Sequence, residues 1–272
     1  MQSVERVTLI WVVGMYAAAA AYLASPFMHG SSWVLDIVKT AIGAFVGAGL
    51  AFVTTRLHDA SRRKREDIAA GRLAFQLLLL QWLDCLNYRH GLRTRLDVLA
   101  RGLGPSAPAW LYAYPVSYTF TPAPDVDAKS LAFLFERDRS GSALDRVMVA
   151  QQRFTDLKVR SRELVDAARA VQSKLASKLP TETGPHELSA IEQAVSADLK
   201  ATARDAMLAC LSLSGEENNE ILKQALVQLR ASIVACYPDV ELPKAVTPPA
   251  QLLERNLPPL PVQIARAIAS IG

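Results

Sequence analysis

The chain has 272 residues, of which 51% are hydrophobic and 21% charged, and its formal net charge at pH 7 is +4. Lys and Arg outnumber Asp and Glu only in residues 1–101, by 12 to 7, whereas residues 102–272 carry 18 against 19. This distribution argues against a large nucleic-acid-binding face. Three scattered cysteines likewise argue against a disulfide framework.

Two apolar segments, Val7–Phe27 and Trp33–Thr55, lie close together near the N-terminus, joined by Met28–Ser32. At a helical rise of about 1.5 Å per residue, each is long enough to cross the roughly 30 Å hydrocarbon core of a bilayer. A removable signal peptide is the alternative, but Tyr22 stands where its cleavage site needs a small residue. The sequence therefore predicts a two-helix transmembrane hairpin within residues 1–55.

The second span carries two charges, Asp36 and Lys39, near its outer end. Three residues apart on a helix, they share a face and can pair. One interpretation is an interfacial ion pair beside Trp33, and the other is a polar path lining an assembly of several hairpins.

Small residues follow in the same span, where they would let helices approach closely in lipid. Packing within one hairpin and packing between hairpins of different chains, which would make a homo-oligomer, both fit the pattern. The residues expected to form this contact are Gly43, Ala44, Gly47 and Ala48.

A basic cluster follows the second span directly, whereas the turn before that span has no Lys or Arg. Such an excess stays on the cytoplasmic side, so both termini are expected in the cytoplasm. The cluster should also hold anionic lipid headgroups. It consists of Arg56, Arg62, Arg63, Lys64 and Arg65.

Residues 56–237 are predicted to form an all-α, antiparallel bundle of four or five helices. The second membrane helix should continue to Arg101, about 100 Å in all, with a kink at Gly71 or Gly91. Residues 75–86, FQLLLLQWLDCL, are apolar nearly all round, which indicates a central helix or a face where copies of the protein meet.

Residues 102–126 interrupt the helical pattern with five prolines and closely spaced aromatic residues. Pro115 limits any strand here to a sheet edge. Either the aromatics pin a long connection to the bundle, or they form a recognition loop for a partner. These aromatics are Trp110, Tyr112, Tyr114, Tyr118 and Phe120.

Helix start and stop signals divide the remaining chain. Asp127 is expected to cap a short helix, and Ser142 and Ser214 to open long ones through capping boxes with Asp145 and Glu217. The expected helices end near Leu179 and Tyr237, with another at about 185–212 between them after a break at Pro180–Gly184. Residues 238–272 form a Pro-rich segment, either a connector or a docking ligand, with a short helix at Val262–Ile271.

The sequence contains no recognisable catalytic or metal-binding motif. We therefore predict that the protein is not an enzyme and has no cofactor or metal site, and we identify no small-molecule substrate. The four histidines lack ligand spacing, and the cysteines should be small buried hydrophobes. These residues are His29, His58, His90 and His186 with Cys85, Cys210 and Cys236.

The stretch GAFVGAGLAFVTTRLHDASRRKREDIAAGRLAFQLLLLQWLDCLN, within residues 40–87, resembles the two-transmembrane effector proteins encoded beside some bacterial retrons. The resemblance implies a bacterial inner-membrane protein of anti-phage defence. It also implies an effector that damages the membrane, is kept silent by a reverse transcriptase–DNA complex, and is released by infection.

Three hypotheses follow. In the first, the hairpins oligomerise and permeabilise the inner membrane when the helical body is triggered. In the second, the hairpin only anchors a scaffold or adaptor that presents a protein-interaction domain. In the third, a hydrolase or nuclease site is hidden in the fold, which would require a cavity with clustered carboxylates or histidines.

Overall fold

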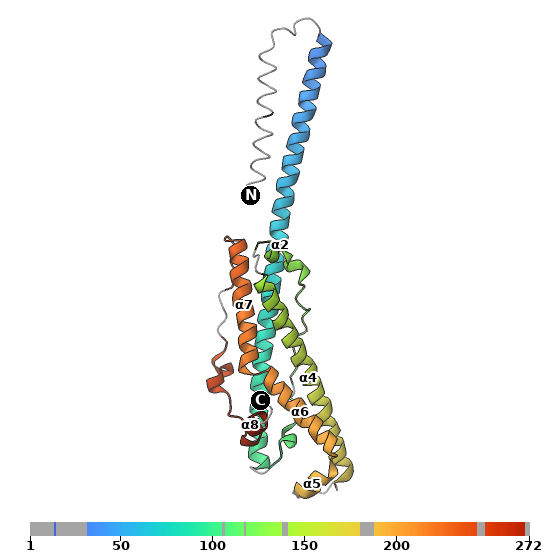
Figure 1. Cartoon of the computed structure of the whole chain (residues 1–272), viewed down its shortest axis with the longest axis vertical. Helices are drawn as coiled ribbons and strands as arrows, with labels where there is room; N and C mark the ends of the chain where they lie inside the picture. Colours follow the sequence, from blue (N-terminus) through green and yellow to red (C-terminus); the bar gives the residue numbers. More distant parts are fainter. Residues whose placement is uncertain are drawn as a thin grey trace. The chain divides into compact units, whose positions relative to one another are not determined.

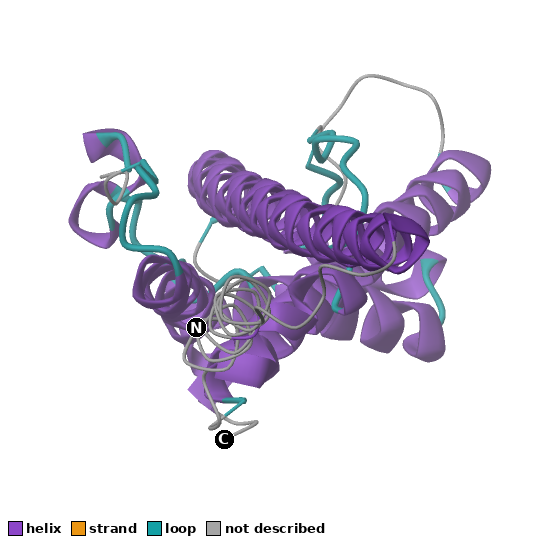
Figure 2. Cartoon of the chain, turned by 90° about the horizontal axis from the view of Figure 1, so that it is seen from above, coloured by secondary structure: helices purple, strands orange, loops and turns teal. Residues whose placement is uncertain are grey.

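The computed structural model shows an all-helical chain, as the sequence predicts, and none of the described residues lies in a strand (Figure 2). The first predicted span and its turn lie outside the described residues, apart from Gly14. The structure describes residues 14, 32–104, 107–116, 118–137, 141–179, 188–243 and 248–269.

Two compact units make up the chain, Met1–Glu66 and Asp67–Gly272. Helix α2, Ser32–Leu103, is one uninterrupted helix of 72 residues and contributes to both units (Figure 1). Neither Gly71 nor Gly91 interrupts it. A Cβ atom added at Gly71 would lie 3.0 Å from Cδ1 of Ile233, so this glycine permits close approach of α2 to the helix that carries Ile233.

The core of the second unit is formed by the later turns of α2 and three further helices, α4 (Ser142–Lys178), α6 (Ala197–Leu213) and α7 (Glu216–Cys236). Helix α4 packs against both α6 and α7 (Figure 1). Each helix contributes side chains with no solvent exposure, because one apolar stripe of each faces the others. Examples are Leu78 of α2, Leu157 of α4, Met207 of α6 and Leu229 of α7.

Short helices fill the connections. The sequence predicts at most an edge strand in the aromatic stretch, but the first residues of this stretch, Ala109–Tyr112, form a 3₁₀ turn, η2. The predicted C-terminal helix is present as α8, and its Ile264 is fully buried. These elements are η2 (Ala109–Tyr112), η3 (Lys129–Leu131), α3 (Ala132–Arg137), α5 (Leu188–Ala194), η4 (Ala250–Leu252), η5 (Glu254–Asn256) and α8 (Val262–Ala269).

The two predicted capping boxes are wrong, although the helices begin where expected. Gly141 is the N-cap of α4, with a φ of 63° that favours glycine, and the Ser142 hydroxyl accepts a hydrogen bond from Gln228 at 2.7 Å. Gly215 is the N-cap of α7, and the Ser214 hydroxyl donates to the carbonyl of Cys210 at 2.7 Å. In both cases a nearby partner competes for the hydroxyl.

The single helix predicted at about 185–212 is divided into α5 and α6. Ser196 separates them as the N-cap of α6, where its hydroxyl accepts a hydrogen bond from the backbone N–H of Leu199 at 3.4 Å. The predicted break at Pro180–Gly184 lies outside the described residues. Asp127 accepts from the N–H of Lys129 at 3.0 Å and so starts η3, ahead of α3.

Candidate functional site

The segment of α2 from Gly43 to Leu57 exposes large apolar side chains, among them Phe45 and Leu50, which are 59% and 58% exposed. The hydroxyls of Thr54 and Thr55 donate to backbone carbonyls one turn earlier, at 2.7 and 2.8 Å. Exposed apolar groups with internally satisfied polar groups are what a helix in hydrocarbon requires.

By length and composition, α2 is the one helix among the described residues that could cross a membrane. Half of its most apolar window is nevertheless buried inside the protein, which is also typical of a core helix. The distinction therefore depends on which residues of α2 are exposed.

The predicted small-residue contact lies on an open face of α2. Gly43, Ala44, Gly47 and Ala48 are all exposed, and a Cβ atom added at either glycine would meet nothing within 4 Å. This surface has room for another helix. Asp36 and Lys39 lie in α2, but their side chains are outside the described residues, and so is any pairing between them.

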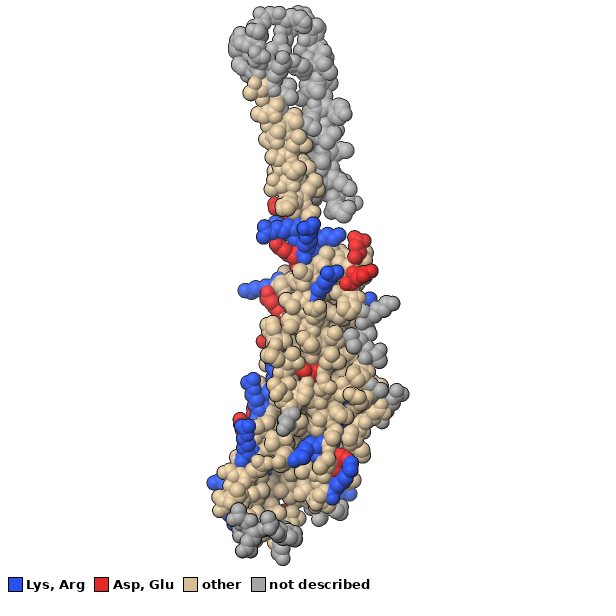
Figure 3. All heavy atoms as spheres, turned by 180° about the vertical axis from the view of Figure 1, so that it is seen from behind, with Lys and Arg blue, Asp and Glu red and all other residues tan. Residues whose placement is uncertain are grey.

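The five basic residues that follow the apolar segment are all exposed, and Figure 3 shows Lys and Arg side chains gathered on α2 where that segment ends. The guanidinium of Arg56 lies 5.0 Å from the ring centroid of Phe52. Arg62 pairs with Glu66 at 2.8 Å, and this pairing raises the pKa of Arg62. Arg63 and Arg65 are exposed to the surroundings, as binding to anionic headgroups requires.

The predicted partner loop packs most of its aromatic residues inward. Trp110 and Tyr112 are buried. Tyr118 and Phe120 are half-buried in an aromatic cluster with Tyr88 of α2, their ring centroids 5.9 and 5.4 Å from that of Tyr88. Aromatic burial of this kind fixes the loop to the helices.

Tyr114 is the exposed member of the five, at 37%. The guanidinium of Arg95 lies 4.0 Å from its ring centroid, which is cation–π geometry. Of the predicted loop residues, Tyr114 is therefore the one whose ring is exposed at the surface.

Two polar side chains within the core hold the same loop. Asp84 accepts hydrogen bonds from the Tyr118 hydroxyl and from the backbone N–H and hydroxyl of Thr121, at 2.8, 2.8 and 3.0 Å. Burial and the neighbouring Asp84 together raise the pKa of Tyr118. The Asp84 carboxylate thus anchors the loop through three charge-assisted bonds.

Gln151 of α4 makes the second anchor. Its amide oxygen accepts from Gln81 of α2 at 2.7 Å and from the N–H of Val126 at 3.2 Å, and its amide nitrogen donates to Asp125 at 2.6 Å. Sequence reasoning missed both anchors. Their only signal is that Gln81 and Asp84 interrupt an otherwise apolar block.

A cavity of about 560 Å³ lies between this loop and α4, lined by Tyr118, Phe120 and three α4 cations. Lys158 is 5.3 Å from the ring centroid of Phe154, and Arg169 is 3.9 Å from Asp166. The three cations are Lys158, Arg162 and Arg169. Together with the aromatic wall, they give the cavity a chemistry that suits an acidic group.

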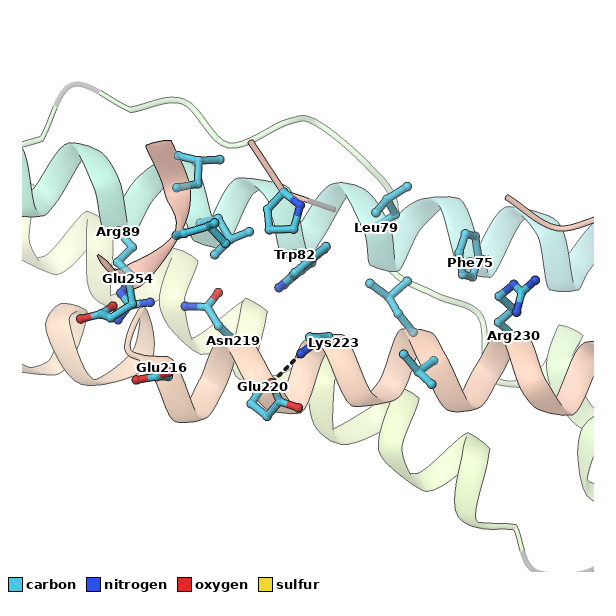
Figure 4. A pocket seen from close by; sticks show the side chains of 16 residues that line it. Phe75, Leu79, Trp82, Arg89, Glu216, Asn219, Glu220, Lys223, Arg230 and Glu254 are labelled. Carbon is cyan, nitrogen blue, oxygen red and sulfur yellow. Dashed lines mark hydrogen bonds and ion pairs between the residues drawn. The ribbon is translucent and has the colours of Figure 1, made fainter. Parts of the chain in front are cut away.

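A second cavity, of about 480 Å³, lies between α2, α7 and residues 248–254 (Figure 4). We call it the α2–α7 groove. Its walls are mainly Phe75, Leu79 and Trp82 of α2 facing Leu226 and Val227 of α7. A cleft of this size and apolarity is typical of a site for a small molecule.

Carboxylates also line the α2–α7 groove. A hidden hydrolase or nuclease site would require such carboxylates to cluster in a cavity. Glu254 pairs with Arg89 and with Arg93, the latter at 2.9 Å, and Glu220 lies 3.2 Å from Lys223. Burial lowers the pKa of both Arg89 and Arg93. Within the described part of the chain, no three His, Cys, Asp or Glu side chains gather in a way that could hold a metal ion.

The three cysteines are free thiols and are buried, as the sequence predicts. Burial raises the pKa of Cys85 to about 12 and that of Cys210 to about 11, so both remain protonated at neutral pH. Comparison of the chain with protein-family models, curated proteins and solved structures finds no match. Function is therefore inferred from the residues and their geometry.

Proposed function

We propose that this chain is a non-enzymatic protein of the bacterial inner membrane. Two N-terminal helices cross the bilayer, and both termini and an antiparallel helical bundle lie in the cytoplasm. The observation that supports this most strongly is the exposed apolar surface of α2, from Phe45 to Leu57, followed at once by exposed basic residues. Apolar area left in water is unfavourable by about 25 cal/mol per Å², and Lys and Arg favour the cytoplasmic side.

Membrane fractionation and reporter fusions test this location. The full chain should stay with the membrane after an alkaline carbonate wash. A C-terminal green fluorescent protein should be fluorescent, and a C-terminal alkaline phosphatase inactive. A chain that is soluble without detergent, or an active C-terminal phosphatase, would contradict the proposed topology.

We further propose that the hairpins associate and permeabilise the membrane when the helical body is triggered. The exposed face at Gly43, Ala44, Gly47 and Ala48, open for close helix packing, supports association. Asp36 and Lys39 would then contribute a polar path. The resemblance to retron effectors makes a reverse transcriptase–DNA complex the proposed partner that keeps the protein silent.

An anchored adaptor is the second candidate. The exposed Tyr114 and the three cations of the cavity beside the aromatic loop favour it, because they offer a surface for an acidic partner. In this function the hairpin supplies location only.

Membrane potential in cells that express the protein separates the two candidates. The effector should depolarise the membrane when triggered, and Gly43→Leu or Gly47→Leu should abolish the effect by blocking close packing. Gly102→Leu is the matched control, because Gly102 is also an exposed glycine of α2 with nothing within 4 Å of an added Cβ atom. An adaptor would cause no depolarisation and would tolerate all three changes.

A further inference from the structure

The α2–α7 groove is long and narrow. It follows α2 from Phe75 to Arg89 and α7 from Glu216 to Arg230, fifteen residues on each helix, which at helical rise is about 20 Å from the first residue to the last. Pro248, Leu252 and Leu253 line it as well. A volume of about 480 Å³ spread over this length suits an extended chain better than a helix, whose diameter with side chains is about 10–12 Å.

One end of the groove has its charges neutralised within the protein. Glu254 pairs with both Arg89 and Arg93, and Glu216 lines the same end of the groove, so two carboxylates balance the two cations; Figure 4 shows Glu254 beside Arg89. The side chain of Arg89 is only 9% exposed, and that of Arg93 is 13% exposed. This end is therefore closed by an ion pair that belongs to the fold.

The opposite end carries an unmatched cation. Arg230 lies beside Phe75 in Figure 4 and makes no ion pair with any described residue, and its buried Nε has no hydrogen-bond partner. The residue as a whole is only half-buried, so the rest of the guanidinium, which is a permanent cation, remains accessible. A carboxylate placed at this end of the groove would pair with it.

We propose that the α2–α7 groove binds a long-chain fatty acid, with the acyl chain along the apolar walls and the carboxylate on Arg230. An acyl chain spans half of the roughly 30 Å hydrocarbon core of a bilayer, about 15 Å, and a fully extended chain is somewhat longer, so its length matches that of the groove. Burial of its methylenes against the apolar walls favours binding. This site does not depend on whether the protein acts as an effector or as an adaptor.

Photo-crosslinking tests the site in the full chain reconstituted in nanodiscs. A sixteen-carbon fatty acid carrying a diazirine should label residues 75–89 and 216–230, and unlabelled palmitate should compete. Val227→Trp should remove this labelling by filling the groove without loss from the core, since Val227 is 54% exposed. Ala231→Trp, at an exposed α7 position outside the groove lining, should retain it.

Arg230 is tested with two ligands of the same chain length. Arg230→Gln should weaken competition by palmitate about tenfold, as expected for one charge-assisted hydrogen bond, and leave competition by hexadecanol unchanged. Arg230→Lys should restore part of the loss. Labelling confined to residues 43–57, equal loss for both ligands, or equally strong competition by two-chain phosphatidic acid would overturn the proposal.

Discussion

Two stretches of the same helix differ in what surrounds their apolar residues. Between residues 43 and 57 of α2, Phe45, Leu50 and Phe52 are exposed, whereas between residues 71 and 96 side chains such as Leu78 and Leu92 are buried in the second unit. Both stretches are uninterrupted helix rich in apolar residues. Apolarity along one helix therefore does not by itself separate a lipid-facing segment from a core segment.

The polar residues of the two stretches also differ in the partners that they bond. In the first, Thr54 and Thr55 donate within their own helix. In the second, Gln81 and Asp84 bond to residues far away in the sequence, Gln151, Tyr118 and Thr121. A helix in lipid has to satisfy its polar groups locally, while a core helix can use them to hold other segments.

Truncation of a leucine should have its largest effect in the buried stretch. Leu78→Ala removes a side chain with no solvent exposure and should lower the free energy of unfolding by about 2–5 kcal/mol. Leu50→Ala is the matched control and should change it by less than about 0.5 kcal/mol. Denaturant unfolding of the detergent-solubilised full chain measures both. Equal losses of unfolding free energy would contradict the assignment of one stretch to the core and the other to an exposed surface.

A charge placed on each stretch should give the opposite ranking in a membrane-insertion assay. Leu50→Arg should oppose insertion by about 2.5–3.5 kcal/mol if this residue faces lipid. Leu73→Arg should have no effect on insertion, because Leu73 is 54% exposed in the second unit. The inserted fraction of each variant is measured after a carbonate wash. A soluble Leu73→Arg variant would contradict the placement of Leu73 outside the membrane-spanning stretch.

Alanine at glycine positions tests how closely each stretch is packed within the chain. Gly71→Ala should lower the free energy of unfolding by about 1–3 kcal/mol, because its Cβ atom would lie 3.0 Å from Ile233. Gly47→Ala has open space around it and should not lower the free energy of unfolding, since alanine is also the better helix former. Thermal melts compare the unfolding temperatures of the two variants. An unchanged unfolding temperature for Gly71→Ala would show that the Ile233 side chain can move aside without cost.

An alkaline loss of stability is expected from the buried thiols. An unfolded cysteine releases its proton near pH 9.0, whereas Cys85 in the folded chain holds it to about 12. Between these values the unfolded state binds fewer protons, so the free energy of unfolding should fall as pH rises. Cys85→Ala should flatten that slope in melts between pH 9 and 11, and an unchanged slope would contradict it.

The same burial predicts slow alkylation. Cys85, Cys210 and Cys236 should react with iodoacetamide only after unfolding, because all three are buried. Rapid labelling of any of them in the folded chain would mean that the second unit opens more readily than its packing indicates.

The helices were predictable from the sequence because their signals are local. The absence of proline between Arg56 and Arg101 indicated the continuation of α2, and the apolar periodicity after Ser142 indicated α4. The helix starts were less predictable. The hydroxyls of Ser142 and Ser214 found other partners, and Ser196 opened a new helix inside a predicted one.

The sites were less predictable than the helices because their parts come from distant segments. Asp84 meets Thr121, 37 residues away, and Arg89 meets Glu254, 165 residues away. Neither pair shares a motif spacing. The position of Arg230 at one end of the groove, on which the fatty-acid site depends, is visible only once α2, α7 and residues 248–254 are assembled.

The most direct test is the environment of a nitroxide spin label at Leu50→Cys and at Leu73→Cys, in the full chain reconstituted in lipid. The buried native thiols should not compete for the label. We predict that the label at position 50 is relaxed mainly by oxygen, which concentrates in lipid, and the label at position 73 mainly by a water-soluble nickel chelate. Nickel relaxation at both positions would contradict the membrane-spanning assignment of α2.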